Sequence, residues 1–104
     1  MDVDRLAARL AAIASPPRLR ILAELADAPL HVSELARRVG MSRALLYMHL
    51  TRLEEAGFVA GRLELGADGK ALKFFDVQPF TLSVDLRAVV DAVRSTPVPP
   101  KESP

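Results

Sequence analysis

The sequence contains no cysteine and no tryptophan, and its aromatic residues are one tyrosine and four phenylalanines. Without cysteine the chain forms no disulfide, no sulfur-ligated zinc or iron–sulfur site and no thiolate nucleophile. No apolar run approaches the roughly 18–20 residues that cross a bilayer. The first residues, Met1-Asp2-Val3-Asp4-Arg5, are acidic where a signal peptide is basic. We therefore expect a cytoplasmic protein, with no membrane partner, that is held together by packing alone.

What the sequence does contain is typical of one globular domain. The chain has 104 residues, of which 50% are hydrophobic and 26% are charged, with a formal net charge of +1. This length fits a single core and excludes a multi-domain enzyme. A domain of this size without disulfides is often stabilised by oligomerisation, so we expect a dimer.

The spacing of apolar residues predicts four helices in the first part of the chain. We expect helices at residues 3–14 and 16–26, with Ser15 as the cap and Pro16 in the first turn of the second. A short extended piece at residues 30–32 precedes a two-turn helix at 33–39. Gly40 then allows a sharp turn, and Ser42 caps a longer helix that ends near Ala56.

The rest of the chain predicts a hairpin and a final helix. Residues 58–60, 62–65 and 71–77 have strand character, and Asp68-Gly69 suits the tight turn between the last two runs. We expect the final helix at residues 82–93 and a disordered, proline-rich tail at 96–104. The predicted fold is therefore mainly α with a small β-hairpin (α+β), a winged helix-turn-helix that occupies residues 1–95.

The helix-turn-helix is the part that predicts a function. Ala36 and Gly40 are four residues apart, which suits close crossing of two helices. Between residues 35 and 53 there are four arginines and no acid, which favours double-stranded DNA as the partner. Side chains away from the buried stripe of the second helix are candidates for the major groove: Ser42, Arg43, Ala44, Tyr47, Met48 and Thr51. Candidates for phosphate contacts are Arg37, Arg38, Arg52 and, in the wing, Lys70 and Lys73.

The two ends of the domain carry apolar stripes that exceed what so small a fold easily buries. They predict a dimer face made by Val3, Leu6, Leu10, Leu82, Leu86, Val89, Val90 and Val93. Two-fold symmetry then predicts a pseudo-palindromic site with half-sites about 10 base pairs apart or a multiple of that.

Residues 10–78 resemble the ArsR/SmtB-like winged helix transcriptional repressors. Residues 15–22 are similar to that family's opening D-P-T-R-L-x-I-L, and residues 31–36 to its third helix. Residues 42–59, with His49-Leu50 and Ala56-Gly57, resemble S-x-x-x-V-S-x-H-L-x-x-L-x-x-A-G-L-V, and residues 69–75 resemble its wing, G-x-x-x-x-Y-Y. The resemblance implies a homodimer, formed by the first and last helices, that binds operator DNA and represses genes beside its own.

The sequence departs from the family at its metal sites. Members that use a Cys-x-Cys pair have it where this chain has His31 and Ser33, and members that use the last helix have Asp-x-His where this chain has Asp85, Leu86 and Arg87. A nickel or zinc site made by His31 and carboxylates of another chain is an alternative to a solvent-facing or capping histidine. A separate sensor protein is another source of the signal.

Two other classes of function compete with the repressor. A winged helix can be a protein-interaction module, which the apolar Ala44, Leu45 and Met48 and the nearly neutral wing would favour. An enzyme is not predicted, because the chain has no phosphate-binding glycine loop, no His-Glu-x-x-His pattern and no nucleophile elbow. DNA affinity that falls steeply with salt would separate the repressor from the interaction module.

Overall fold

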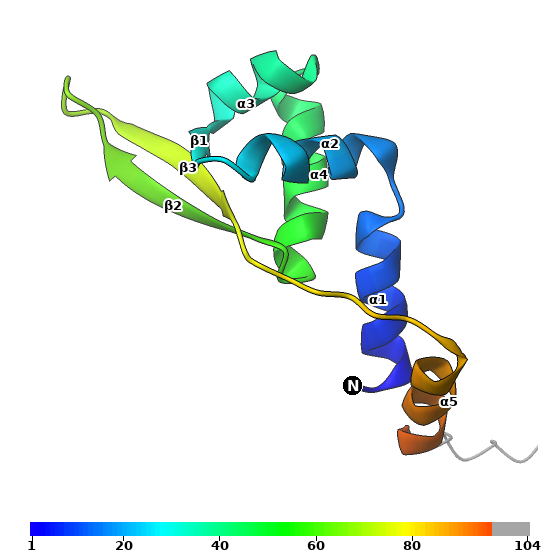
Figure 1. The fold of residues 1–104 in the computed structure, drawn as a ribbon. Coiled ribbons are helices and arrows are strands. Elements are labelled where there is room, and N and C mark those ends of the chain that lie inside the picture. Colours follow the sequence, from blue (N-terminus) through cyan, green and yellow to red (C-terminus); the bar gives the residue numbers. More distant parts are fainter. Residues whose placement is uncertain (97–104) are drawn as a thin grey trace, which may run out of the picture.

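A computed structural model describes residues 1–96 of the chain. The first four helices pack together beside a small antiparallel sheet, the fifth lies apart from the sheet next to the first, and the hairpin of the sheet extends away from the helices as a wing (Figure 1). The elements follow in the order α1 (Val3–Ile13), α2 (Pro16–Leu25), β1 (Leu30–His31), α3 (Val32–Val39), α4 (Arg43–Glu55), β2 (Val59–Leu65), β3 (Ala71–Val77) and α5 (Leu86–Ser95). The winged helix-turn-helix and the α+β class are confirmed.

Side-chain caps define the starts of four helices. Asp2, Ser15, Ser42 and Asp85 each accept a hydrogen bond from the backbone N–H three residues later, which satisfies an N–H that has no partner inside the helix. Because capping residues are readable in a sequence, the predicted bounds of α1, α2 and α4 agree with the structure to within a residue at each end, and those of α3, which has no side-chain cap, agree as closely.

The prediction for the last helix is wrong at its start. Residues 82–85 are not helical, and α5 begins at Leu86. Leu82 and Leu86 have helical spacing, but Asp85 has an extended backbone and its carboxylate accepts from the N–H of Ala88 at 2.8 Å. Asp85 is therefore the cap of α5 and not a side chain on its outer face. The predicted tail from residue 97 onward lies outside the described residues.

The sheet has the strand order β1-β3-β2, with every pair antiparallel. The two runs predicted at 58–60 and 62–65 form one continuous strand, β2, in which Gly61 lies opposite Phe75. A Cβ atom at Gly61 would lie only 2.9 Å from the Phe75 ring, so glycine allows β3 to deliver that ring to the core. β1 adds the third strand by pairing Leu30 with Phe75.

The core lies between α2, α3, α4 and the base of the wing. Phe58, at the start of the wing, and Leu46, Leu50 and Leu53 of α4 are almost completely buried in it. The other members come from α1, α2, α3 and the sheet: Ala12, Ile21, Leu22, Leu25, Val32, Leu35, Ala36, Val59 and Phe75. The inward face of α4 is thus fixed by packing, and its opposite face is left at the surface.

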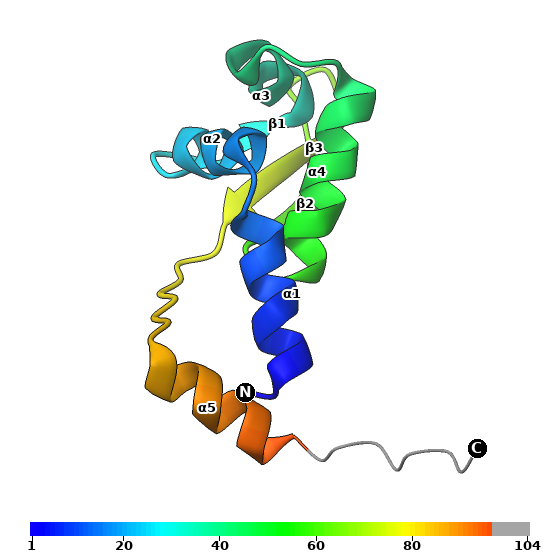
Figure 2. The same cartoon turned by 90° about the vertical axis from the view of Figure 1, so that its right-hand side faces the viewer.

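α5 lies away from this core. An extended segment, residues 78–85, carries the chain from β3 past the helices to α5, which packs beside the N-terminal half of α1 (Figures 1 and 2). The N–H of Val3 donates to the Thr96 hydroxyl at 2.9 Å and joins the two helices at their ends. Within residues 1–96, no helix is both long and apolar enough to cross a membrane.

Candidate nucleic-acid interface

α3 and α4 form a helix-turn-helix with a short turn. Gly40 has φ +67°, a left-handed conformation that glycine adopts at little cost, and the N–H of Met41 donates back to the Ala36 carbonyl at 3.1 Å. Ala36 is buried where the two helices cross. The predicted roles of Ala36 and Gly40 in the turn are therefore confirmed.

The outward face of α4 carries every side chain that the sequence predicted there. Ser42, Arg43, Ala44, Tyr47, Met48, Thr51 and Arg52 are all exposed. Met48 has 68% of its surface exposed and Leu45 has 43%, large values for apolar residues in the middle of a helix. The Ser42 hydroxyl accepts from the N–H of Leu45 at 3.1 Å, and its own hydrogen remains available to donate.

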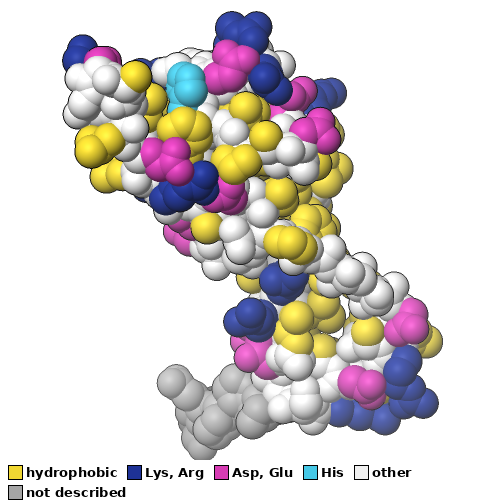
Figure 3. Space-filling view, turned by 60° about the vertical axis from the view of Figure 1, so that its left-hand side comes forward, with side chains coloured by type: hydrophobic (Ala, Val, Ile, Leu, Met, Phe, Trp, Pro, Cys, Tyr) yellow, Lys and Arg dark blue, Asp and Glu magenta, His cyan; other side chains and the backbone are white. Residues whose placement is uncertain are grey.

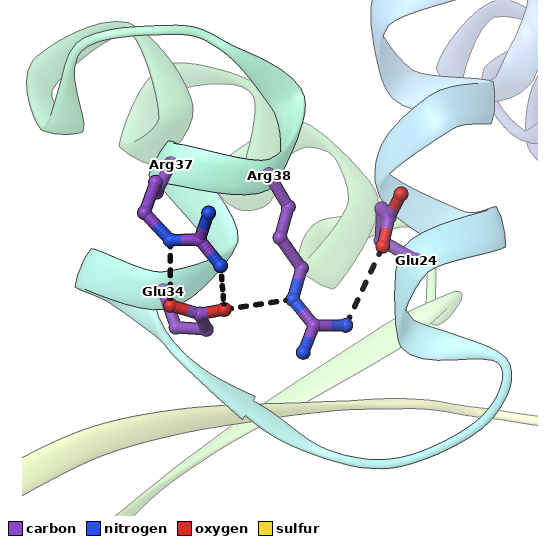
Figure 4. Close-up of polar contacts among 4 residues, drawn as sticks. All are labelled: Glu24, Glu34, Arg37 and Arg38. Atoms are coloured by element: carbon purple, nitrogen blue, oxygen red, sulfur yellow. Dashed lines mark hydrogen bonds and ion pairs between the residues drawn. The ribbon is translucent and has the colours of Figure 1, made fainter.

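The sequence places Arg37 and Arg38 in a span without acids, but in the structure both arginines pair with acids from outside that span. Glu34, one helical turn before them, accepts from Nε of Arg37 at 3.0 Å and from Nε of Arg38 at 2.9 Å, and Arg38 also lies 3.6 Å from Glu24 (Figure 4). Hydrogen bonds from Arg37 and then Arg38 lower the pKa of Glu34 to about 2. The carboxylates of Glu34 and Glu24 therefore offset the charge of both arginines.

The wing has little free positive charge. Arg62 pairs with Glu64 at 2.8 Å and also with Asp76. Lys73 is half-buried and its Nζ lies 5.6 Å from the centre of the Phe75 ring, whereas Lys70 is exposed beside the turn. On the face that Figure 3 presents, basic and acidic side chains are interspersed. Of the two wing lysines, Lys70 is the more accessible to a phosphate.

Two arginines that the sequence analysis did not select connect the other helices to α4. Arg9 of α1 donates to the Ala56 carbonyl at 3.2 Å and stacks 4.6 Å above the Phe58 ring. Arg18 of α2 donates from Nε to the Ala12 carbonyl at 2.6 Å, and its Nη1 lies 3.3 Å from Nδ1 of His49. The contacts of Arg9 with Ala56 and of Arg18 with His49 span 47 and 31 residues, so local patterns do not reveal them.

His49 is held as an acceptor in this arrangement. Burial, and then the neighbouring Arg18, lowers the pKa of His49 below its ordinary value of 6.5. The neutral ring can accept from Arg18 at Nδ1 and then carries its hydrogen on Nε2. His49 therefore connects α4 to α2 within the fold.

The residues at the family's metal positions do not fit a metal. His31 precedes α3, makes no capping hydrogen bond and packs edge-on against Phe74 at 5.8 Å. Ser33 is exposed, and Asp85 is engaged as a cap. Residues 1–96 contain no group of three His, Cys, Asp or Glu side chains that could hold a metal ion.

The apolar residues predicted for dimerisation lie at the α1–α5 end. Leu86 has 77% of its surface exposed and Val93 has 51%. Val89 is also exposed, and the others are half-buried: Val3, Leu6, Leu10, Leu82 and Val90. Leu6 and Leu82 line one hollow between α1 and α5. The structure leaves Leu86, Val89 and Val93 of α5 exposed at this end of the domain.

The short turn, the exposed α4 and the projecting hairpin together define a winged helix-turn-helix DNA-binding domain. The sequence profile described as "Bacterial regulatory protein, arsR family" matches residues 15–60. An uncharacterised HTH-type transcriptional regulator of Methanocaldococcus jannaschii, MJ0229, is 32% identical over 74 residues, which cover 71% of this chain and 77% of that protein. The chain therefore belongs to the ArsR family of bacterial transcriptional regulators, which are not enzymes.

Other relatives agree with this assignment. NmtR, an HTH-type transcriptional regulator of Mycobacterium tuberculosis, is 39% identical over 57 residues, which are 55% of this chain and 48% of that protein. The solution structure of Mb0332 from Mycobacterium bovis, a homodimeric winged helix-turn-helix DNA-binding domain, has a TM-score of 0.64 and 28% identity. The similarity covers 72% of this chain and 65% of the solved Mb0332 chain, which is a fragment of residues 1–100.

Proposed function

We propose that this protein is a homodimeric repressor that binds a pseudo-palindromic operator in double-stranded DNA. The observation that carries the proposal is the outward face of α4. This face combines exposed apolar and arginine side chains, and α4 has no carboxylate before Glu54. Water solvates such an apolar face poorly, whereas the major groove offers it both thymine methyl groups and hydrogen-bonding base edges.

Ser42, Arg43, Ala44, Tyr47, Met48 and Thr51 are the residues that we propose for the base edges. In a helix-turn-helix the N-terminal part of the second helix enters the major groove, which places Arg43 where it can make two hydrogen bonds to guanine. Ala44 and Met48 can only offer apolar contact, for instance to a thymine methyl group. Sequence preference then rests mainly on Arg43.

Phosphate contacts fall to Arg52 and, in the wing, to Lys70 and the less accessible Lys73. Arg37 and Arg38 keep this role only in weakened form, because a phosphate would have to compete with the carboxylate of Glu34 for both of them. Phosphate contacts fix the orientation of the protein on the duplex and carry no sequence information.

The second subunit covers the α1–α5 surface in this proposal. Leu86, Val89 and Val93 then become buried together with their symmetry-related copies, and the homodimeric Mb0332 domain offers a precedent. A two-fold axis between two α4 helices requires half-sites about 10 base pairs apart, or a multiple of that. Such a regulator acts in the cytoplasm, where its DNA is.

The inducing signal needs a site beyond those described above. His31 does not supply a nickel or zinc site within one subunit, since no three ligands gather within residues 1–96. We propose that the signal arrives through a separate sensor protein. The alternative is a metal shared between His31 and carboxylates of another subunit, which an effect of nickel or zinc on DNA binding would support.

Fluorescence anisotropy tests the proposal directly. The protein is titrated into the duplex from upstream of its own gene and into a scrambled duplex at several salt concentrations, with and without nickel or zinc. Tight, salt-sensitive binding to the native duplex alone is expected. Absence of binding to either duplex would contradict the proposal and favour a protein-interaction module.

Two variants separate base reading from phosphate contact. Arg43→Ala should cost about 1–3 kcal/mol on the native duplex and relax sequence preference, whereas Lys70→Ala should weaken binding to both duplexes about equally. Equal losses on both duplexes for Arg43→Ala would refute its role in reading bases.

A further inference from the structure

A shallow groove runs between the start of α2 and the outer side of α4, and it has a distinct chemistry. Its walls are Arg18, Leu45, Met48, His49, Thr51 and Arg52. These residues supply two guanidinium groups, one hydroxyl and one imidazole, and no carboxylate. Figure 2 shows the start of α2 and the end of α1 beside α4. The groove therefore adjoins the face of α4 that carries the proposed base-reading residues.

The guanidinium of Arg18 is fixed in place. Its Nε and Nη2 donate to the Ala12 and Ala11 carbonyls at 2.6 Å and 3.3 Å, and its Nη1 is directed at His49. A guanidinium has five N–H groups, so two remain after these three contacts. An arginine that is already ordered loses less side-chain entropy when it binds an anion.

Charge pairing distinguishes the arginines of this groove from Arg37, Arg38 and Arg62. Within residues 1–96, the ion pairs with carboxylates involve Arg37, Arg38, Arg62 and Arg87, and neither Arg18 nor Arg52 is among them. Glu55 lines the adjoining hollow between α1 and α4 together with both arginines, but it forms no ion pair with either of them. The positive charge of the groove is therefore available to an anion.

We propose that this groove binds one phosphate of the DNA backbone, with Arg18 and Arg52 on either side of it and the Thr51 hydroxyl as a further donor. The proposal rests on the DNA-binding function above and adds Arg18 to the interface, while it moves Thr51 from the base edges to the backbone. Arginine suits this role because its planar fork matches the oxygens of a phosphate.

The test is a scan of the operator duplex with single methylphosphonate substitutions, each of which removes one backbone charge. Wild-type protein, Arg18→Gln, Arg52→Gln and the double variant are compared by anisotropy at several salt concentrations. At one phosphate of each half-site, the methylphosphonate should weaken DNA binding by the wild-type protein. The same methylphosphonate should have little further effect on DNA binding by either single variant. Because both arginines share that phosphate, the double variant should lower the salt slope by only about 0.9.

Arg20→Gln is the matched control, since it also removes one arginine of α2, but one that is exposed and does not line the groove; its salt slope should remain that of the wild type. Arg18→Gln also loses contacts to α1, so Arg52→Gln and Thr51→Val test the groove if Arg18→Gln unfolds, as judged by circular dichroism. Coupling of Arg18 and Arg52 to different phosphates, or to none, would overturn the phosphate site while leaving the repressor intact. A wild-type protein that binds neither duplex would overturn both.

Discussion

Removing the carboxylate of Glu34 should strengthen DNA binding, although it breaks three charge-assisted contacts. Glu34 engages both Arg37 and Arg38, and Glu34→Gln leaves the side chain nearly the same size while it removes that charge. In a helix-turn-helix the first helix crosses the DNA backbone, so Arg37, now unpaired, and Arg38, with only Glu24 left as a partner, would meet phosphates. The variant should fold like the wild type, because the contacts that it loses lie at the surface.

The size of the effect follows from counterion release. Each additional phosphate contact steepens the dependence of log K on log salt by about 0.9. The ratio of the affinity at about 50 mM salt to the affinity at about 200 mM salt should therefore be larger for the variant than for the wild type, by about 3.5-fold if one arginine gains a phosphate and by about 12-fold if two do. Anisotropy titrations of wild type and Glu34→Gln across that range measure the ratio. Asp27→Asn, at an exposed position after α2, makes the same change in net charge and is the control. Equal salt slopes for Glu34→Gln and Asp27→Asn would refute the reasoning.

Three other predictions concern stability and assembly. Leu50→Ala should reduce the free energy of unfolding by about 2–5 kcal/mol, because Leu50 is almost fully buried. Met48→Ala, on the outer face of the same helix, should change the free energy of unfolding by less than about 0.5 kcal/mol and still weaken DNA binding. Denaturant titrations that show the same loss of stability for Leu50→Ala and Met48→Ala would contradict the assignment of the two faces of α4. Lowering the pH from about 7.5 to about 5.5 should reduce the free energy of unfolding, because the pKa of His49 is lowered in the folded chain and the unfolded chain binds the proton more readily. Urea titrations should show a smaller pH difference in His49→Gln, and an unchanged difference would assign the effect to other groups. Leu86→Asp should convert the dimer to a folded monomer by light scattering, since an acid in the first turn suits the helix dipole but not an apolar interface; a persistent dimer would exclude this face.

Local signals in the sequence explain why most of the fold could be predicted. Ser42 and Gly57 mark the ends of α4 chemically, and Ala36 with Gly40 marks the turn before it. The start of α5 was missed because the helical spacing of Leu82 and Leu86 outweighed Asp85, although aspartate is a common cap at the start of a helix. Apolar spacing cannot distinguish a helical turn from an extended segment that happens to carry leucine at the same interval.

The candidate site was less predictable because it depends on contacts between distant segments. The pairing of Glu34 with Arg37 and Arg38 could have been predicted from the sequence, because an acid three or four residues before an arginine lies on the same face of a helix. Glu34 lies one residue before the acid-free span of residues 35–53. The groove of Arg18 and Arg52 had no local signal, because it exists only once α2 lies against α4.

The contacts of Arg9 and Arg18 couple α1 to α4, so that the two helices would move together. Arg9 fastens the C-terminal end of α4 to α1, and Arg18 ties its middle to the last turn of α1. Any rotation of α1 about the axis of a dimer therefore carries α4 with it. In a dimer, the distance between the two α4 helices along the duplex would be set at the far end of the molecule, where α1 meets α5. A small change there would alter this distance, and so the fit to the two half-sites, without altering any base-reading side chain.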